Sequence, residues 1–533
     1  MDDRVNGRRW AGLVFISIAV SLIIVDSTIV NVAVPSIVED LAISSTEVQW
    51  VQEAYTLVFA SFLLVFGSLA DRFGRRRLLL VGVAVFAAAS IAASLAPTGP
   101  ALIAARLVQG VGGSMILPTT LSLINATFRG RERGIAFAVW GSTIGGMAAV
   151  GPLLGGWLTT AFSWRWAFGI NIPLGVLIVI GVLVTVAESR GEGRSAIDGV
   201  GALLSVLTMA PLVFALIEGR TYGWWTVDTV PTLGSWAWPL PLSPVPLAFA
   251  VAVVALASFV AWGLARQRRG RPTLLALDLF RIGSFRNGNI AAAVVSLGEF
   301  GIILALPLWL QFVVGFDALQ TGLLLLSLAV GSFVASGVAG ALSGRLAPVW
   351  VVRGGLVAEI VGVAGVALTI GPDATWGPLI PFLFVYGLGV GLATAQLTGV
   401  VLAEVPPAAG GQASGTQSTS RQLGAALGVA ILGTVLFSTT AGVLASSLEE
   451  RGLPADQRDT VVSQVVDSAG AAIAGLAQSP ATQDVASDAR AAFSDGTRAA
   501  ALTAAAFLAL GLLSTTALGR RSRTDGPEGP IRG

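Results

Sequence analysis

The sequence predicts an all-α integral membrane protein. Of its 533 residues, 54% are hydrophobic and only 12% are charged, and the mean hydropathy is +0.80. Soluble domains are much more polar than this. A helix needs about 20 apolar residues to cross a bilayer, and about fourteen segments of the chain reach that length. They lie near residues 10–36, 48–70, 78–96, 100–125, 134–160, 166–187, 198–217, 246–265, 287–314, 321–343, 351–370, 377–404, 412–441 and 498–518.

Arginine clusters predict how these segments are oriented. All 32 basic residues are Arg, and their clusters either precede the first segment or follow an even-numbered one, so that they fall on the same side if the spans alternate. Because positively charged loops remain in the cytoplasm, both termini are predicted to be cytoplasmic, which requires an even number of spans. The clusters are Arg4–Arg9, Arg72–Arg77, Arg129–Arg133, Arg190–Arg194, Arg266–Arg286, Arg345–Arg353 and Arg520–Arg523.

Missing residue types exclude several kinds of site. The chain contains no Cys, no His and no Lys. A Walker A nucleotide site needs Lys, while zinc, haem and His-based acid–base sites rely on the other two. We therefore expect no enzyme activity, no metal and no cofactor, and any transported proton must use carboxylates. The sequence pI of 9.6 does not indicate a nucleic-acid partner, because the Arg residues are partitioned by membrane side.

The segments divide into two sets of six with one pair between them. We predict a six-helix bundle over residues 1–190, a two-helix insertion over 191–270 and a second six-helix bundle over 271–519, followed by a cytoplasmic tail over 520–533. Parallel half-repeats of this kind are a transporter plan, in which the substrate binds between the halves.

Two loops on the side opposite the Arg clusters are long. Residues 218–245 are rich in Trp and Pro and are predicted to lie at the membrane interface as a lid or belt. Residues 442–497 are polar and rich in Ala and Ser. For this second loop two interpretations stay open, a small external helical hairpin or a solvated spacer.

The loop between the second and third segments carries the most specific motif, Gly67-Ser-Leu-Ala-Asp71-Arg-Phe-Gly74-Arg-Arg-Arg77. Its glycines allow two helix ends to approach closely and the chain to reverse with a positive φ. Asp71 can pair with an Arg or with the N-terminus of a neighbouring helix. The pattern resembles a loop of the major facilitator superfamily of secondary transporters. This resemblance implies a gating loop that contains Gly67, Asp71, Arg72, Gly74 and Arg75.

The same loop indicates an internal repeat. Its Gly67-x-Leu69-x-Asp71-Arg72 pattern is echoed by Gly340-x-Leu342-x-Gly344-Arg345, which lies at the same place in the second set of segments. The echo supports two related halves.

A single acid, Asp26, interrupts the first apolar segment between Leu22 and Pro35. A carboxylate at mid-membrane costs ~3 kcal/mol or more, so it normally faces a wet cavity. The stretch is similar to the first-span signature of drug:proton antiporters, which implies that Asp26 and Asn31 line the translocation path. The alternative is a structural carboxylate paired to a neighbouring helix.

Glu53 and Arg106 are predicted to lie at the same depth as Asp26. Two close carboxylates in a low dielectric would retain one proton near neutral pH, although the sequence does not say whether the acids face each other. Arg106 begins Arg106-Leu-Val-Gln109-Gly110, which resembles a superfamily motif. A guanidinium that pairs with and leaves an acid can couple protonation to a conformational change. A static ion pair is the alternative for Arg106, and a surface-near acid is the alternative for Glu53.

The fifth segment is rich in small residues that allow close helix packing. Its string of Gly141, Gly145, Gly151, Pro152, Gly155 and Gly156 resembles the motif that marks antiporters rather than symporters in this superfamily. Trp164-Arg165-Trp166 and then Asn171-Ile-Pro173 resemble the entry to the sixth span of the fourteen-span drug:proton antiporters.

Buried polar residues of the second half are expected to line a substrate cavity. Glu299 is the best candidate for a cation-facing or second proton site, with Gln396, Gln417 and Arg421 as further lining residues. Glu359 is a further acid inside a span, and its role stays open. Some fourteen-span pumps for divalent cations carry acids in the thirteenth span, where this chain places Arg421, so a strict preference for dications is disfavoured.

Together the resemblances imply a major facilitator fold of fourteen spans. They imply a proton-coupled antiporter that exports amphipathic or cationic small molecules across the bacterial inner membrane, acting as a monomer. The energy would come from the proton gradient. The alternative on the same fold is a dedicated exporter of an endogenous metabolite or lipid.

Overall fold

The computed structural model describes residues 2–43, 45–191, 198–233, 236–342, 345–372 and 374–518. Within these ranges the chain is helical, apart from turns and one antiparallel pair of two-residue strands, β1 (Thr232–Leu233) and β2 (Trp236–Ala237). Gly344 of the predicted repeat and the predicted tail over 520–533 lie outside the described residues.

Thirteen of the described helical segments are long and apolar enough to cross a membrane. Helix α5 (Gly130–Ala161) is not among them, although its 32 residues span about 48 Å at 1.5 Å per residue. Its middle contains Gly and Ala in place of larger apolar residues, which lowers its hydropathy. The chain is therefore a multi-pass membrane protein, and the count of fourteen spans stays a prediction.

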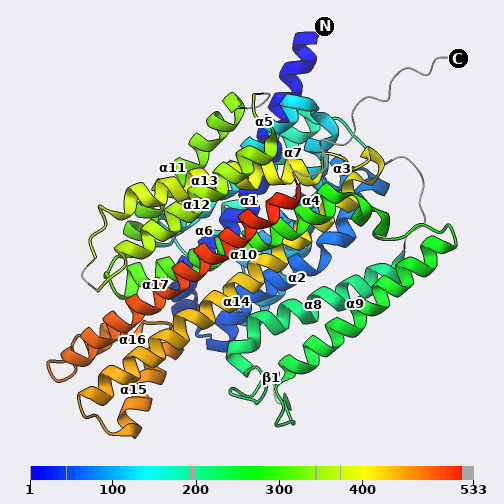
Figure 1. Cartoon of the computed structure of the whole chain (residues 1–533). Coiled ribbons are helices and arrows are strands. Elements are labelled where there is room, and N and C mark those ends of the chain that lie inside the picture. The colour runs from blue at the N-terminus through cyan, green and yellow to red at the C-terminus, as the bar shows by residue number, and fades with distance from the viewer. Residues whose placement is uncertain are drawn as a thin grey trace, which may run out of the picture.

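In the first half, α1 and α4 are the inner helices, and each packs mainly against two others. Helix α4 packs against both α2 and α3, while α5 and α7 pack against α1 (Figure 1). The sixth predicted segment is a four-residue helix followed directly by a longer one. The helices of this half are α1 (Asp2–Leu41), α2 (Ser45–Phe73), α3 (Arg75–Ser94), α4 (Gly99–Thr127), α5, α6 (Trp166–Gly169) and α7 (Asn171–Thr185).

The insertion is a helical hairpin of α8 (Gly199–Tyr222) and α9 (Pro244–Arg268). Helix α8 packs against α2 and against α14 (Gly410–Glu450) of the second half. Asp198 caps α8 by accepting a hydrogen bond from the amide of Gly201, and it also accepts one from the indole of Trp262 on α9. Helix α9 leaves large apolar side chains such as Val253 and Val254 exposed, which suits a lipid-facing helix.

The second half repeats the arrangement of the first. Helix α10 packs against α14 and α17, and α12 packs against α13 and α17. The halves meet where α5 contacts α11 and α13 and where α2 contacts α14. The elements are η1 (Leu277–Arg281), α10 (Gly283–Phe312), α11 (Ala318–Leu342), α12 (Pro348–Thr369), α13 (Leu379–Val401), η2 (Pro407–Ala409), α14 (Gly410–Glu450), α15 (Ala455–Asp467), α16 (Ala472–Leu476), α17 (Gln483–Ser514) and η3 (Thr515–Leu518).

The long segment 442–497 is helical, so the spacer interpretation is wrong. Helix α14 continues to Glu450, α17 begins at Gln483, and α15 and α16 lie between them. These helices bury Leu448, Val465 and Phe493 and project at the end of the bundle away from the N-terminus (Figure 1). The apolar core of the bundle thus continues into this segment and makes it a folded extension.

Candidate functional site

A buried polar network lies inside the first half. We call it the N-terminal network, and it consists of Asp26, Ser90, Arg106, Gln109 and Asn171, whose side chains are all at most 1% exposed. Arg106 donates from Nη1 to Oδ2 of Asp26 at 2.5 Å. The amides of Gln109 and Asn171 both donate to Oδ1 of Asp26, at 3.1 and 2.7 Å, and both also donate to Ser90. Helices α4 and α7 therefore both donate to the carboxylate on α1, and α3 joins the network through Ser90.

Arg106 also contacts helix α2, on the side of its guanidinium away from Asp26. Its Nε donates to the backbone oxygen of Val51 at 3.0 Å, and its guanidinium carbon lies 4.4 Å from the centre of the Tyr55 ring. A buried ion pair with its remaining donors and acceptors satisfied is held in one geometry. The predicted pairing of Asp26 with Arg106 is therefore present in the structure.

Glu53 does not join this network. It is two positions from both Val51 and Tyr55, and two residues turn a helix by about 200°. Its side chain accordingly lies toward α8, where Tyr222 follows the apolar part of the helix. Burial raises the pKa of the Tyr222 hydroxyl, and the charges of Glu218 and Glu53 raise it further. A close Asp26–Glu53 pair is thus not formed, and the side chain of Asn31 lies outside the described residues.

Sequence reasoning missed three members of the network. Gln109 and Asn171 belong to the motifs described for the fourth and sixth spans, so these motifs could have identified both residues as members of the site. Ser90 is one of many small residues in its helix and carries no sequence signal.

The predicted gating loop joins the two halves. Asp71 accepts hydrogen bonds from the backbone amides of Gly411 and Gln412, in the first turn of α14, at 2.7 to 3.1 Å. Arg75 donates to the same carboxylate at 2.7 Å. The positive end of the α14 dipole and a guanidinium thus meet one buried acid. The expected pairing of Asp71 is confirmed for both kinds of partner.

Glycines make this contact possible. A Cβ atom on Gly67 would lie 2.6 Å from the backbone oxygen of Gly411, so only glycine allows α2 and α14 to meet there. Gly74 has φ of 109°, as expected for the reversal, and the N-terminus of α3 that follows is capped by Glu188. Arg72 lies beside this contact, with its guanidinium carbon 5.5 Å from the Phe73 ring centre.

The small residues of α5 pack against α1 and α11. Gly151 lies against Thr28 of α1, and a Cβ atom on Gly155 would lie 2.9 Å from the side chain of Ile29. Gly141 is buried, Pro152 lies within the helix, Gly156 is partly buried, and the side-chain position of Gly145 lies outside the described residues. The predicted close helix packing is therefore present at Gly151 and Gly155.

A second buried network, the C-terminal network, consists of Glu299, Glu359, Tyr386, Thr394 and Arg421. Glu299 accepts a hydrogen bond from the hydroxyl of Thr394 at 2.8 Å and pairs with Arg421 at 3.4 Å. The Tyr386 hydroxyl donates to the backbone oxygen of Glu299 at 3.2 Å. Neither carboxylate oxygen of Glu359 has a hydrogen-bond partner among the described residues.

The predicted glutamines lie beside this network. Gln417 donates to the Thr398 hydroxyl at 3.1 Å, and Gln396 donates across the halves to the backbone oxygen of Gly134 at 3.4 Å. Both are buried. Of the expected cavity residues, the structure therefore brings Glu299 and Arg421 together and places the two glutamines in separate contacts.

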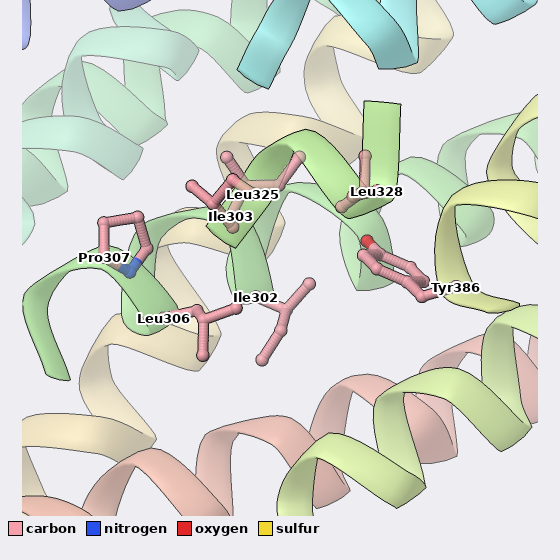
Figure 2. Close-up of a pocket in the computed structure, with 7 residues that line it drawn as sticks. All are labelled: Ile302, Ile303, Leu306, Pro307, Leu325, Leu328 and Tyr386. Carbon is pink, nitrogen blue, oxygen red and sulfur yellow. The ribbon is translucent and has the colours of Figure 1, made fainter. Parts of the chain in front are cut away.

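A small, largely apolar pocket lies next to the C-terminal network. Figure 2 shows its lining, in which Tyr386 is the residue shared with the network. None of the predicted cavity residues lines it. Its other walls are aliphatic side chains of α10 and α11, which look like any membrane-facing residues in the sequence, namely Ile302, Ile303, Leu306, Pro307, Leu325 and Leu328.

Known proteins resemble the chain along most of its length. A family model described as Major Facilitator Superfamily matches residues 16–429. The probable actinorhodin transporter of Streptomyces coelicolor is 36% identical, over 83% of this chain and 75% of its own length. A multidrug efflux pump of Mycolicibacterium smegmatis is 35% identical over 94% of both chains, and the puromycin resistance protein of Streptomyces alboniger is 34% identical over 82% and 84%.

Solved structures share the fold. The proton:xylose symporter XylE has a TM-score of 0.59 and 12% identity, over 95% of both chains. A human organic anion transporter has a TM-score of 0.56 and 13% identity, over 96% of this chain and 99% of its own.

Proposed function

The chain belongs to the major facilitator superfamily, and on this basis we propose that it is a proton-coupled antiporter that exports amphipathic organic molecules. It would act in the bacterial cytoplasmic membrane, as a monomer with both termini in the cytoplasm. Three relatives that are 34 to 36% identical support this assignment, since they are named as a probable actinorhodin transporter, a puromycin resistance protein and a multidrug efflux pump.

One observation carries the proposal: each half buries an acid paired with an Arg, at Asp26–Arg106 and Glu299–Arg421. Buried ionisable groups inside spans are costly and are kept where a proton or charge must cross the membrane. The absence of His and Cys from the sequence leaves carboxylates as the proton carriers.

The coupling step begins with the Asp26–Arg106 pair. While Arg106 pairs with Asp26, the carboxylate is stabilised in its charged form. A helix movement that separates the two leaves Asp26 in a low dielectric, where it takes up a proton from the open side. Return of Arg106 expels that proton, so protonation follows the conformation of the first half.

The gating loop links this step to the alternation of access. The contact of Asp71 with the N-terminus of α14 holds the two halves together at one end of the bundle. We assign that end to the cytoplasm, so the contact would close the inner gate. Breaking it would open the pathway to substrate from inside the cell.

A dedicated exporter of an endogenous compound is the second candidate. It is favoured by relatives whose names give a single antibiotic, as with actinorhodin and puromycin. A narrow substrate profile would support this candidate, and transport of unrelated cations and neutral compounds would support multidrug export.

The test uses inverted membrane vesicles with an imposed pH gradient. We expect ethidium and puromycin to accumulate when the vesicle interior is acidic and to leave when an ionophore collapses the gradient. Vesicles that contain the D26N variant are the control. Accumulation that is independent of the gradient would contradict proton coupling, and no accumulation of any compound in a broad screen would contradict export.

A further inference from the structure

We propose that Glu359 of α12 is a second proton-binding residue, which holds a proton in this conformation. Its side chain is 0% exposed, and neither of its carboxylate oxygens has a hydrogen-bond partner among the described residues. Asp26 differs, because three side chains donate to its two oxygens. An ionised carboxylate without donors is strongly disfavoured in an apolar interior, whereas the neutral acid is tolerated.

The surroundings of Glu359 contain too few positive charges to stabilise every nearby acid in its ionised form. Glu299 of α10 and Arg421 of α14 lie within electrostatic reach, and Tyr386 of α13 interacts with both acids. Helix α17, which also packs against α12, carries no charged residue between Arg498 and its end at Ser514. On α12 itself the other charged residue is Arg353, which donates to Thr515. Two carboxylates therefore share one guanidinium.

Hydrogen bonds decide which of the two acids keeps the charge. Arg421 approaches Glu299 through Nη2, and Thr394 donates to the other oxygen of Glu299. Glu299 is thus held as the carboxylate, and Glu359 is left as the neutral acid. Close packing fixes this arrangement, because a Cβ atom on Gly389 would lie 2.7 Å from Cγ of Glu359.

Arg421 also supplies a route for releasing the proton. Its Nη1 is buried and has no hydrogen-bond partner among the described residues. When a helix movement turns Arg421 toward α12, its charge stabilises the carboxylate of Glu359. The O–H bond then breaks and the proton passes to water in the opened pathway. Tyr386 places this exchange next to the pocket, because its side chain lines the pocket and its hydroxyl donates a hydrogen bond to the backbone oxygen of Glu299.

Infrared spectroscopy of the purified full chain tests the protonation directly. At neutral pH we expect a carbonyl band of a buried, protonated carboxylic acid that is lost in E359Q and shifted in E359D. The matched control is E404Q, since Glu404 is an exposed acid that accepts a hydrogen bond from Ser284, and it should keep the band. If the wild type lacks the band, or if E359Q retains it or E359D leaves it unshifted, Glu359 is not the protonated residue.

The role in transport rests on the proposed function and has its own readout. Ethidium added to the purified protein in weakly buffered solution should release protons, and E359Q should release one fewer than the wild type. Equal release from both would overturn the role of Glu359. If the wild type neither binds ethidium nor releases protons, ethidium export fails, while the infrared band still decides the protonation of Glu359.

Discussion

Both halves bury a carboxylate on their first core helix, but they complete its surroundings in different ways. Asp26 of α1 receives donors from α4 and α7, and every charge in its network is paired. Glu299 of α10 shares a single guanidinium with a second acid, Glu359, that receives no hydrogen bond from the described residues. The N-terminal network contains one acid and one Arg, whereas the C-terminal network contains two acids and one Arg.

This difference indicates that the N-terminal network resists helix movement and that the C-terminal network exchanges a proton. A closed ion pair is costly to break and therefore resists movement until the helices around it shift. In a network with one guanidinium and two acids the protonation states of the acids are coupled, so a displacement of Arg421 from Glu299 toward Glu359 can release the proton. We infer that the first half sets the conformational threshold and that the second half responds to the bound molecule.

The largest effect is expected from D26N, which breaks the balanced network. Removal of one partner leaves Arg106 as an uncompensated buried charge, so the variant should lose about 3 to 5 kcal/mol of stability and all gradient-driven transport. Thermal unfolding in detergent and vesicle transport measure the two losses. The double variant D26N/R106Q should recover much of the stability but no transport. Full transport by D26N would remove Asp26 from the mechanism.

A smaller and selective effect is expected from E299Q. The amide keeps the shape of Glu299 but loses the charge that attracts a cation. Transport of a cationic substrate should fall by about thirtyfold, or about 2 kcal/mol, while a matched neutral substrate should be nearly unaffected. Both are measured in the same vesicles, with E404Q as the control. Equal loss for both substrates would mean that Glu299 serves proton exchange or packing.

The contact that joins the two halves should give a moderate effect. D71N removes the negative charge that meets the N-terminus of α14, which is worth about 1 kcal/mol, or about a fivefold change in conformational balance. The exchange rate should change by that factor while substrate affinity stays constant. E188Q is a matched control, because Glu188 caps α3 within one half. A change in affinity at constant exchange rate would argue against a gate.

The smallest effect should come from an acid–Arg pair outside the membrane. Arg165, helped by the Trp164 indole, holds the pKa of Asp40 below its ordinary value. A lowered folded-state pKa stabilises the protein above the unfolded value, near 3.9, and this contribution is lost as pH falls through the folded-state pKa. D40N should therefore lower the unfolding temperature slightly at pH 7, and the difference from the wild type should be smaller at about pH 2. The same difference at both pH values would contradict this assignment.

Local composition determined much of this fold. Each apolar segment is a helix because a run of that length forms its own backbone hydrogen bonds in lipid, whatever its neighbours do. The glycines at positions 67 and 74 and the acid at position 71 were readable for a similar reason, since their roles depend on local backbone geometry. Segment 442–497 was ambiguous, because its Ala-rich composition suits both a solvated chain and a helix.

Only the tertiary structure decided which polar residues meet. Asp26 and Arg106 are 80 residues apart, and Asp71 and Gly411 are 340 apart. Glu53 and Asp26 are predicted to lie at similar depths, yet Glu53 lies within electrostatic reach of Tyr222 on α8. The apolar pocket and the unbonded carboxylate of Glu359 also depend on how helices from different parts of the chain are placed. A sequence reports depth along each helix, whereas the rotation of that helix is set by the sum of its contacts with all its neighbours.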